Sequence, residues 1–598
     1  MTRKSHGQVR QSQVVTTYGP GALIDLPRHS AIVSGLGGWP SPGDLREIVE
    51  PRLSRKIQAM TEVVAPRLYA PPADEAGPGD APLGITVWRF PEWFVVQEKG
   101  GGDREKGRRL VHRKFLDDKG RFDGCDVVAT RFVRACNRGH VDDLNWRAFV
   151  HGGEGVDCQR PLWLVERGTG GDLGDLVVRC ECGKRRGMNE AAIIGDSSPI
   201  GACQGRRPWL GRGNDEPCGA PARLLIRTAS NAYFSQSVSV LSLPDRGNAV
   251  DSAVRELWDD LSVVQSPDEL AIFRRKPNVT TRLRDFSDED VFAAIGRIRN
   301  NKVDERPVKL VEVDAILAAP EGFGEDVPID PDFHARRLPP RAWRRPGTPD
   351  AIEAVYQLHR MREVVALIGF SRFEAAMPDI QGEYDPEVVR APLAAEPTWF
   401  PAIENRGEGV FIQVKAQAVS AWLARPAVKR RIDSLIAGYE RWKALRKNAR
   451  LFPGGPYLFL HTLSHLLIQS FAMRCGYPAS SVRERVYADD SGKRYGILLY
   501  TGTSDAEGTL GGLVQQARYL RDHLAQALRS GTLCSHDPIC SQHAPGESLE
   551  GRWLHGAACH GCALIAETSC EMRNDHLDRA LVVPVLGCAD AALFAARG

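Results

Sequence analysis

Cysteine placement limits what this chain can fold into more than any other feature of its sequence. Most of its 14 cysteines fall within residues 136–218 and 534–570, often beside glycine or proline. The sequence shows neither the apolar run of a signal peptide nor a stretch long enough to span a bilayer, so we expect a cytoplasmic protein with no membrane partner. Disulfides are rare in that reducing compartment, and clustered cysteines there are expected to bind metal.

The first cysteine group lies between residues 136 and 218. Zinc takes four ligands in a tetrahedron, which proteins usually supply from two tight turns. Gly183 follows a Cys-Glu-Cys turn and would let the backbone fold around an ion. The alternative is that these cysteines are buried small apolar residues. The expected ligands of one site are Cys180, Cys182, Cys203 and Cys218, and Cys136, His140 and Cys158 either belong to a second site or are spare.

The second group contains Cys559-His-Gly-Cys562, a standard two-ligand knuckle. Cys540 and Cys570 complete four thiolates, and Cys534 is the spare candidate. Because four thiolates leave no position for a water molecule, such a site is closed and stabilises the fold instead of performing chemistry. We therefore expect one or two structural zinc ions in the chain.

A histidine pair in His461-Thr-Leu-Ser-His465 has the spacing of one helical face. The zinc-protease motif shares this spacing, but Thr462 stands where that motif has its general-base glutamate. We favour two buried histidines that hydrogen-bond to neighbouring loops. The alternative is an independent metal-dependent hydrolase or nuclease that uses His461, His465 and nearby carboxylates.

The length of 598 residues indicates roughly three to five domains, and the apolar patterns predict an α+β, multidomain fold. Residues 1–124 form an N-terminal segment with loop-rich linkers, and residues 125–245 form a β-rich zinc-binding module. Residues 246–450 form a mostly helical middle domain. Residues 451–598 mix both types, with helices at 456–474 and 512–529, a strand at 495–500, and a cysteine-rich tail.

Charge and motifs limit the nucleotide chemistry. The sequence has no match to G-x-x-x-x-G-K-[ST], so we expect no autonomous P-loop ATPase. The net charge is only +3, so any nucleic-acid site must be local. Two basic stretches qualify: residues 334–346, where Trp343 offers a stacking face, and the polar side of a helix at 428–450. An ordinary solvated face or a surface for an acidic protein is the alternative. The candidate contacts are Arg336, Arg337, Arg341, Trp343, Arg344, Arg345, Lys429, Arg430, Arg431, Lys443 and Lys447.

Four runs spread over nearly the whole chain resemble a known family. They are QSQVVTTYGPGALIDLP, RFVRACNRGHVDDLNW, RTASNAYFSQSVSVLSLP and LHGAACHGCALIAETSCEMRNDHLDRALV. Together they are similar to the DrmB family, the helicase-partner subunits of bacterial DISARM antiphage systems. The last third, with HTLSHLLI and the cysteine tail, also resembles the zinc-binding C-terminal domain of MrfA-type helicases. The pattern of that domain has four cysteines, then an asparagine and a Leu-Asp pair. The corresponding residues here are Cys540 or Cys534, Cys559, Cys562, Cys570, Asn574 and Leu577-Asp578.

The resemblance implies a non-catalytic, DNA-binding subunit that forms a heterodimer with a DrmA-like superfamily 2 helicase. It also implies that the pair loads on DNA, including single-stranded or overhang regions, and helps to distinguish phage DNA from modified host DNA.

Overall fold

The structure is a computed structural model that describes most of the chain. The described residues are 6–27, 29–73, 83–97, 107–153, 157–167, 172–195, 197–243, 250, 253–254, 256–284, 286–299, 306–328, 330–376, 379–381, 389–446, 451–503, 512–547 and 551–594.

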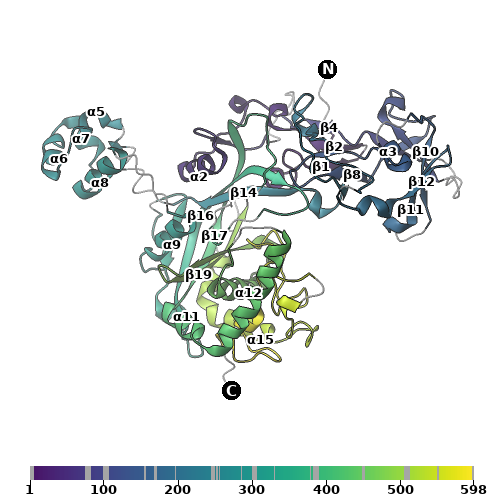
Figure 1. Ribbon diagram of the computed structural model, residues 1–598. Helices are drawn as coiled ribbons and strands as arrows, with labels where there is room; N and C mark the ends of the chain where they lie inside the picture. The colour runs from purple at the N-terminus through teal and green to yellow at the C-terminus, as the bar shows by residue number, and fades with distance from the viewer. Residues whose placement is uncertain are drawn as a thin grey trace. The chain divides into compact units, whose positions relative to one another are not determined.

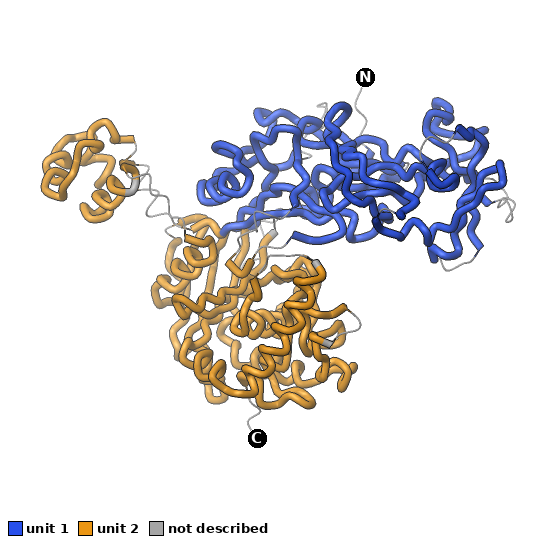
Figure 2. The backbone as a smooth tube through the Cα atoms, in the orientation of Figure 1, with its two compact units in different colours: residues 1–240, 363–377, 384–405 blue, residues 241–362, 378–383, 406–598 orange. Residues whose placement is uncertain are grey.

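The chain divides into two compact units, which Figure 2 shows in different colours. Unit 1 comprises residues 1–240, 363–377 and 384–405, and unit 2 comprises residues 241–362, 378–383 and 406–598. The division falls within the long strands β16 (Ile352–Ser371) and β17 (Trp399–Val414), so each strand contributes residues to both units. The four segments expected from the sequence stay a prediction.

Unit 1 is built mainly from short antiparallel strands. One sheet has the order β1-β2-β4, a second has β12-β11-β10-β6-β5-β7, and a third has β13-β8-β9. The strands are β1 (Leu23–Leu26), β2 (His29–Val33), β3 (Arg67–Tyr69), β4 (Val87–Arg89), β5 (Trp93–Gln97), β6 (Arg108–His112), β7 (Asp126–Ala129), β8 (Phe132–Ala135), β9 (Val141–Asp143), β10 (Leu162–Glu166), β11 (Leu176–Cys180), β12 (Arg185–Gly187), β13 (Arg223–Ile226) and β14 (Phe234–Leu241), with helices α1 (Gln11–Thr16), α2 (Pro51–Thr61) and α3 (Trp146–His151).

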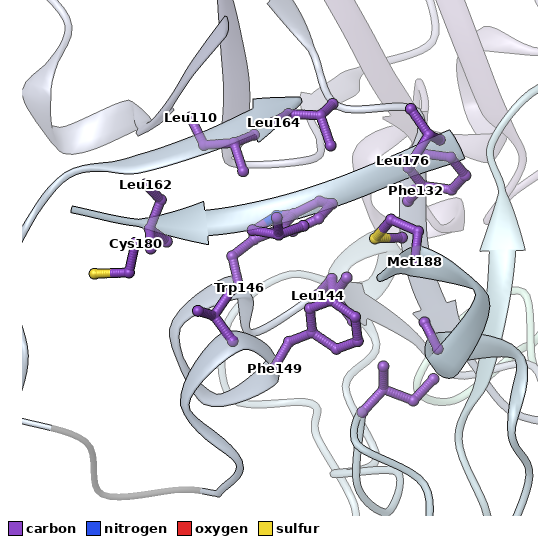
Figure 3. Close-up of a cluster of buried hydrophobic side chains, with 14 of the residues drawn as sticks. Leu110, Phe132, Leu144, Trp146, Phe149, Leu162, Leu164, Leu176, Cys180 and Met188 are labelled. Carbon is purple, nitrogen blue, oxygen red and sulfur yellow. The ribbon is translucent and has the colours of Figure 1, made fainter. Parts of the chain in front are cut away.

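The core of the six-stranded sheet lies against α3. Residues of β10 and β11 alternate between buried and partly exposed positions, as expected for strands with one face on a core. Figure 3 shows Trp146 and Phe149 of α3 among the leucines of these strands, with Cys180 at one end of the cluster. The core therefore fixes the end of β11, from which the Cys180 turn begins.

A small helical cluster forms within residues 250–299. Its helices are α5 (Trp258–Leu261), α6 (Pro267–Phe273), α7 (Pro277–Arg282) and α8 (Asp288–Arg299). Ser266 caps α6 by accepting a hydrogen bond from the amide of Glu269, and Pro267 occupies the first turn. Val254, Leu261 and Leu270 share the buried core of this cluster.

In unit 2 the helix α13 (Gly455–Cys475) packs against the strands β18 (Val482–Asp489) and β19 (Arg494–Thr503) and against the helix α15 (Leu520–Gly531). In the sheet, β19 lies between β18 and β17 and is antiparallel to both. In Figure 1 helices α9, α11, α12 and α15 lie around β17 and β19. Most of α13 is buried, which fits its largely apolar sequence. The remaining elements are α9 (Val308–Leu317), β15 (Phe333–Arg337), α10 (Pro340–Trp343), α11 (Ala416–Leu423), α12 (Pro426–Arg446) and α14 (Gly512–Gln516).

The expected mixed fold is confirmed, and so are the helix at 456–474 and the strand at 495–500. The middle segment, residues 246–450, contains helices as expected. It also contains the strands β15, β16 and β17, which were not expected from the sequence. Both faces of β16 are buried, so its sequence lacks the alternation that marks a half-exposed strand. Among the helices of the described residues, none has both the length and the apolar character needed to cross a bilayer.

Candidate metal centres and basic surface

Metal-binding side chains converge in four places among the described residues. Within each group the potential ligand atoms all lie within 4.8 Å of one another, and every cysteine is free of disulfide bonds. The groups are Cys136, His140, Cys203 and Cys218; His151, Cys158, Cys180 and Cys182; Cys534, Cys540, Cys559 and Cys562; and His461, His465, Glu484 and Cys570.

The C-terminal group of four cysteines has the dimensions of a zinc site. The sulfur of Cys559 lies 3.4 Å from that of Cys534 and 3.7 Å from that of Cys562, and the Cys540 and Cys562 sulfurs are 3.8 Å apart. Four sulfurs bound tetrahedrally at about 2.3 Å from zinc would be about 3.8 Å apart. Backbone amides also donate to these sulfurs, from His536 to Cys534 and from Cys559 to Cys562. Such donors stabilise thiolates, so the site fits a structural zinc ion.

The Cys136 group gathers its ligands from two turns of unit 1. The Nδ1 atom of His140 lies 3.4 Å from the Cys136 sulfur and 3.6 Å from the Cys203 sulfur, and Cys218 completes the group. The other ring nitrogen of His140, Nε2, lies 2.8 Å from a carboxylate oxygen of Glu216. Metal-bound histidines commonly contact a carboxylate through the nitrogen that does not bind the metal. Hydrogen bonding from Cys203, with a further contribution from His140, lowers the pKa of Cys136 to about 4. The same contact raises the pKa of Cys203, so this environment favours the thiolate at Cys136.

The His151 group lies beside the core of Figure 3. His151 ends α3 and places Nε2 3.3 Å from the Cys182 sulfur, while its Nδ1 lies 2.9 Å from the Arg147 carbonyl oxygen. The sulfurs of Cys158 and Cys180 are 3.6 Å apart. The side chain of Arg147 donates to the carbonyl oxygens of residues 158–160 and so holds the Cys158 loop against α3.

The structure groups the cysteines of unit 1 differently from the sequence expectation. Cys180 and Cys182 lie at the end of β11, whereas Cys203 and Cys218 lie in the segment that precedes β13 of another sheet, and the two pairs fall in different groups. The structure instead joins Cys203 and Cys218 to Cys136 and His140, and joins Cys180 and Cys182 to Cys158 and His151. The ligand that sequence reasoning missed is His151, and its only signal was a histidine before Gly152-Gly153, seven residues ahead of Cys158.

In the C-terminal tail the structure exchanges the roles expected for Cys534 and Cys570. Cys534, considered spare, joins the four-cysteine group, whereas Cys570 lies away from it. Cys570 instead contacts His461, with 3.1 Å between the sulfur and Nε2. The two histidines of α13 are buried and contact loop carbonyls, as favoured from the sequence, and they also face Glu484 of β18.

Several predicted nucleic-acid contacts have structural partners. Trp343 is only 1% exposed, so its ring cannot offer the predicted stacking face. Arg336 pairs with Asp326, and Arg431 forms a buried pair with Asp578 at 2.6 Å. These contacts could not be predicted from the two basic stretches, because Asp326 and Asp578 lie outside them.

Other predicted residues remain exposed on unit 2. Arg341, Arg344 and Arg345 follow β15 and are exposed, and Lys429 and Arg430 are exposed on α12. The partly exposed residues are Arg337 and Lys443, and Lys447 lies outside the described residues.

A hollow of about 440 Å³ is lined by arginines near one end of the first basic stretch. Arg474 comes from the last turn of α13, and Arg521 and Arg529 come from α15. Asp522 is the one acidic lining residue among the described residues, and it contacts Arg521 at 2.6 Å. The neighbouring Arg345 also acts electrostatically on Asp522. The lining therefore carries a positive charge that sequence inspection did not detect.

Comparisons with known proteins match residues in both units. Residues 10–234 match the family described as "Domain of unknown function (DUF8724)", and residues 463–563 match the MrfA Zn-binding domain. The second match contains all four members of the C-terminal cysteine group, and the expectation of structural zinc is thereby confirmed. Over 481 residues the chain is 31% identical to the DISARM protein DrmB of Bacillus paralicheniformis. The aligned region covers 78% of this chain and 82% of the relative. The chain therefore belongs to the DrmB family of DISARM proteins.

Proposed function

We propose that the chain is a non-catalytic, DNA-binding subunit that acts with a DrmA-like superfamily 2 helicase in cytoplasmic antiphage defence. Its membership of the DrmB family supports the role in DISARM defence. In this proposal the helicase hydrolyses ATP, and this chain helps the complex to load on foreign DNA and to recognise it.

The arginine-lined hollow is the observation that carries the DNA-binding part of the proposal. The lining of the hollow carries three guanidinium groups and a single carboxylate, and Arg341, Arg344 and Arg345 extend the positive charge along the neighbouring surface. Arginine binds phosphate oxygens through two parallel hydrogen bonds and remains charged at all physiological pH values. The surface therefore suits a nucleic-acid backbone and does not require a particular base sequence.

The metal centres fit a structural role in this division of labour. A closed four-thiolate site fixes the turns of the tail but leaves no position for a reactive water. Hydrolysis at His461 and His465 is disfavoured because both side chains and Glu484 are fully buried. Buried donors of this kind give a substrate no path to the metal.

A DNA-binding titration of the purified chain over a range of salt concentrations tests the proposal. The logarithm of affinity should fall steeply and linearly with the logarithm of salt concentration, since phosphate contacts release counterions. Arg521→Ala combined with Arg529→Ala should weaken binding to all sequences and reduce the salt slope by about 2, about 1 for each lost contact. Arg212→Ala, which removes an exposed arginine of unit 1, is the matched control and should bind normally.

The partnership is tested by copurification with the DrmA-like helicase and by ATPase and nuclease assays with and without it. We expect a stable complex and turnover only when the helicase is present. Robust metal-dependent nuclease activity of the isolated chain that His461→Ala abolishes would favour the hydrolase alternative. Unchanged DNA affinity of the double arginine variant would refute the assigned surface.

A further inference from the structure

We propose that His461, His465, Glu484 and Cys570 bind a structural zinc ion that is separate from the four-cysteine zinc site of the tail. His461 and His465 lie one turn apart on α13, Glu484 lies on β18, and Cys570 belongs to the loop that follows the tail cysteines. The inference concerns an additional metal site and is independent of the proposed DNA-binding function.

The distances between the donor atoms match a single ion. The Nε2 atoms of His461 and His465 lie 3.0 and 3.3 Å from the same carboxylate oxygen of Glu484. The Cys570 sulfur lies 3.1 Å from Nε2 of His461. Donors bound tetrahedrally to zinc are about 3.3–3.6 Å apart for this mixture of atoms, so a small shift would admit the ion.

The opposite side of each imidazole ring supports metal binding. Nδ1 of His465 lies 2.8 Å from the carbonyl oxygen of Ala563, and Nδ1 of His461 lies 3.3 Å from that of His576. A carbonyl can only accept a hydrogen bond, so each Nδ1 carries a proton, and Nε2, which faces Glu484, is the nitrogen left to bind a metal. Metal-binding histidines commonly have this outer hydrogen bond, which fixes the tautomer.

Backbone amides prepare the cysteine for the same role. The amides of Met572 and Asn574 donate to the Cys570 sulfur at 3.4 and 3.1 Å. The amide of Glu571 donates to Glu484, whose other oxygen accepts from Ser464. These donors stabilise negative charge on both the sulfur and the carboxylate.

Charge balance favours an ion over an empty polar cluster. With two neutral imidazoles, the thiolate and the carboxylate carry two negative charges, which a divalent zinc ion neutralises. Without a cation, the two Nε2 lone pairs would face a carboxylate oxygen in a site that is fully buried. A proton on at least one ring would then have to form a buried ion pair with Glu484, whereas a zinc ion offsets the carboxylate and the thiolate together.

The matched MrfA Zn-binding domain ends at residue 563 and begins at residue 463, so neither His461 nor Cys570 lies within it. The four-cysteine site closes turns within the tail. The additional ion would instead join α13 and β18 to the loop that carries Cys570, thereby linking the tail to the centre of unit 2.

Zinc content per chain, measured by inductively coupled plasma mass spectrometry, tests the proposal. Cys570→Ala and Glu484→Gln should each lose one zinc ion relative to the unaltered chain, and Cys540→Ala should lose a different one. The variant with both Cys540→Ala and Cys570→Ala should then lose two. Cys475→Ala is the control, because Cys475 also lies on α13 but belongs to none of the four groups found among the described residues.

Cadmium NMR of the unaltered, cadmium-substituted chain provides a measurement that does not depend on the folding of a variant. We expect one resonance far upfield of the thiolate-rich sites, in the range of a site with one sulfur, two nitrogens and a carboxylate. Full zinc content in both Cys570→Ala and Glu484→Gln, or the absence of this resonance, would overturn the proposal.

Discussion

Asp578→Ala is expected to destabilise unit 2 strongly, because its buried carboxylate accepts four hydrogen bonds from three residues. Arg431 donates to it from Nε at 2.6 Å and from Nη2 at 3.1 Å. The amides of Ala557 and Ala580 donate at 2.9 and 3.0 Å. The side chain of Asp578 is 0% exposed and that of Arg431 is 11% exposed. The substitution leaves a buried guanidinium group and two amides without their acceptor.

The magnitude follows from these contacts. Removing one partner of a buried ion pair costs about 3–5 kcal/mol, and each buried amide that loses its acceptor adds about 1 kcal/mol or more. Since these contributions overlap, we expect a loss of about 5 kcal/mol in the free energy of unfolding. With a urea m-value of about 3 kcal/mol/M, the midpoint of the unit 2 transition should fall by about 1.7 M.

Urea unfolding followed by tryptophan fluorescence, with zinc release recorded in parallel by a chromogenic chelator, measures the loss. Zinc should leave at lower urea concentration in the variant, because Ala557 lies two residues before Cys559. Arg430→Ala removes the exposed neighbour of Arg431 and should change stability by less than about 0.5 kcal/mol. A midpoint shift below about 0.3 M for Asp578→Ala would refute the reasoning, since such a shift corresponds to about 1 kcal/mol at the same m-value.

Three further predictions concern other sites. Cys559→Ser should release the zinc ion of the four-cysteine site and unfold the tail, whereas Cys588→Ser should retain the ion; metal analysis of both variants checks this. Burial lowers the pKa of His523 to about 4, against about 6.5 in an unfolded chain. Between these pH values only the unfolded chain binds the proton, so this contribution to stability is present above pH 6.5 and is lost as the pH falls towards 4. His523→Gln should remove up to about 3 kcal/mol of the acid-dependent loss measured by urea unfolding at several pH values. Arg372→Met should destabilise unit 1 by about 3 kcal/mol in the same unfolding assay, because the buried guanidinium group donates to the carbonyl oxygens of Gly21, Gly139 and Ala232.

Residue type and local spacing were sufficient for several expectations. The Cys559 and Cys562 knuckle needs only a short turn, so both ligands are brought together by local backbone geometry. The helix that became α13 was predicted at 456–474, close to its observed bounds. The long strand β16 was missed because burial on both faces removes the alternation that identifies strands.

Accessibility could not be obtained from local sequence. Trp343 and Arg431 lie in basic stretches that resemble nucleic-acid contacts, yet the fold buries Trp343 and pairs Arg431 with Asp578. The opposite holds for the hollow that Arg474, Arg521 and Arg529 line: the fold brings together basic residues that the sequence does not group. No basic run marks these arginines, since they meet only when the end of α13 packs against α15.

The sequence by itself determined the chemistry available to this protein: cysteine and histidine ligands for zinc, and a mixed α and β fold to carry them. Only the tertiary structure decided which ligands share a site, because a tetrahedral ion takes donors from turns that are far apart in the chain. The fold therefore placed Cys180 and Cys203 in different groups, and the packing of α13 on β18 brought His461 and Glu484 to Cys570. Spacing records neighbours along the backbone, whereas coordination depends on neighbours in space.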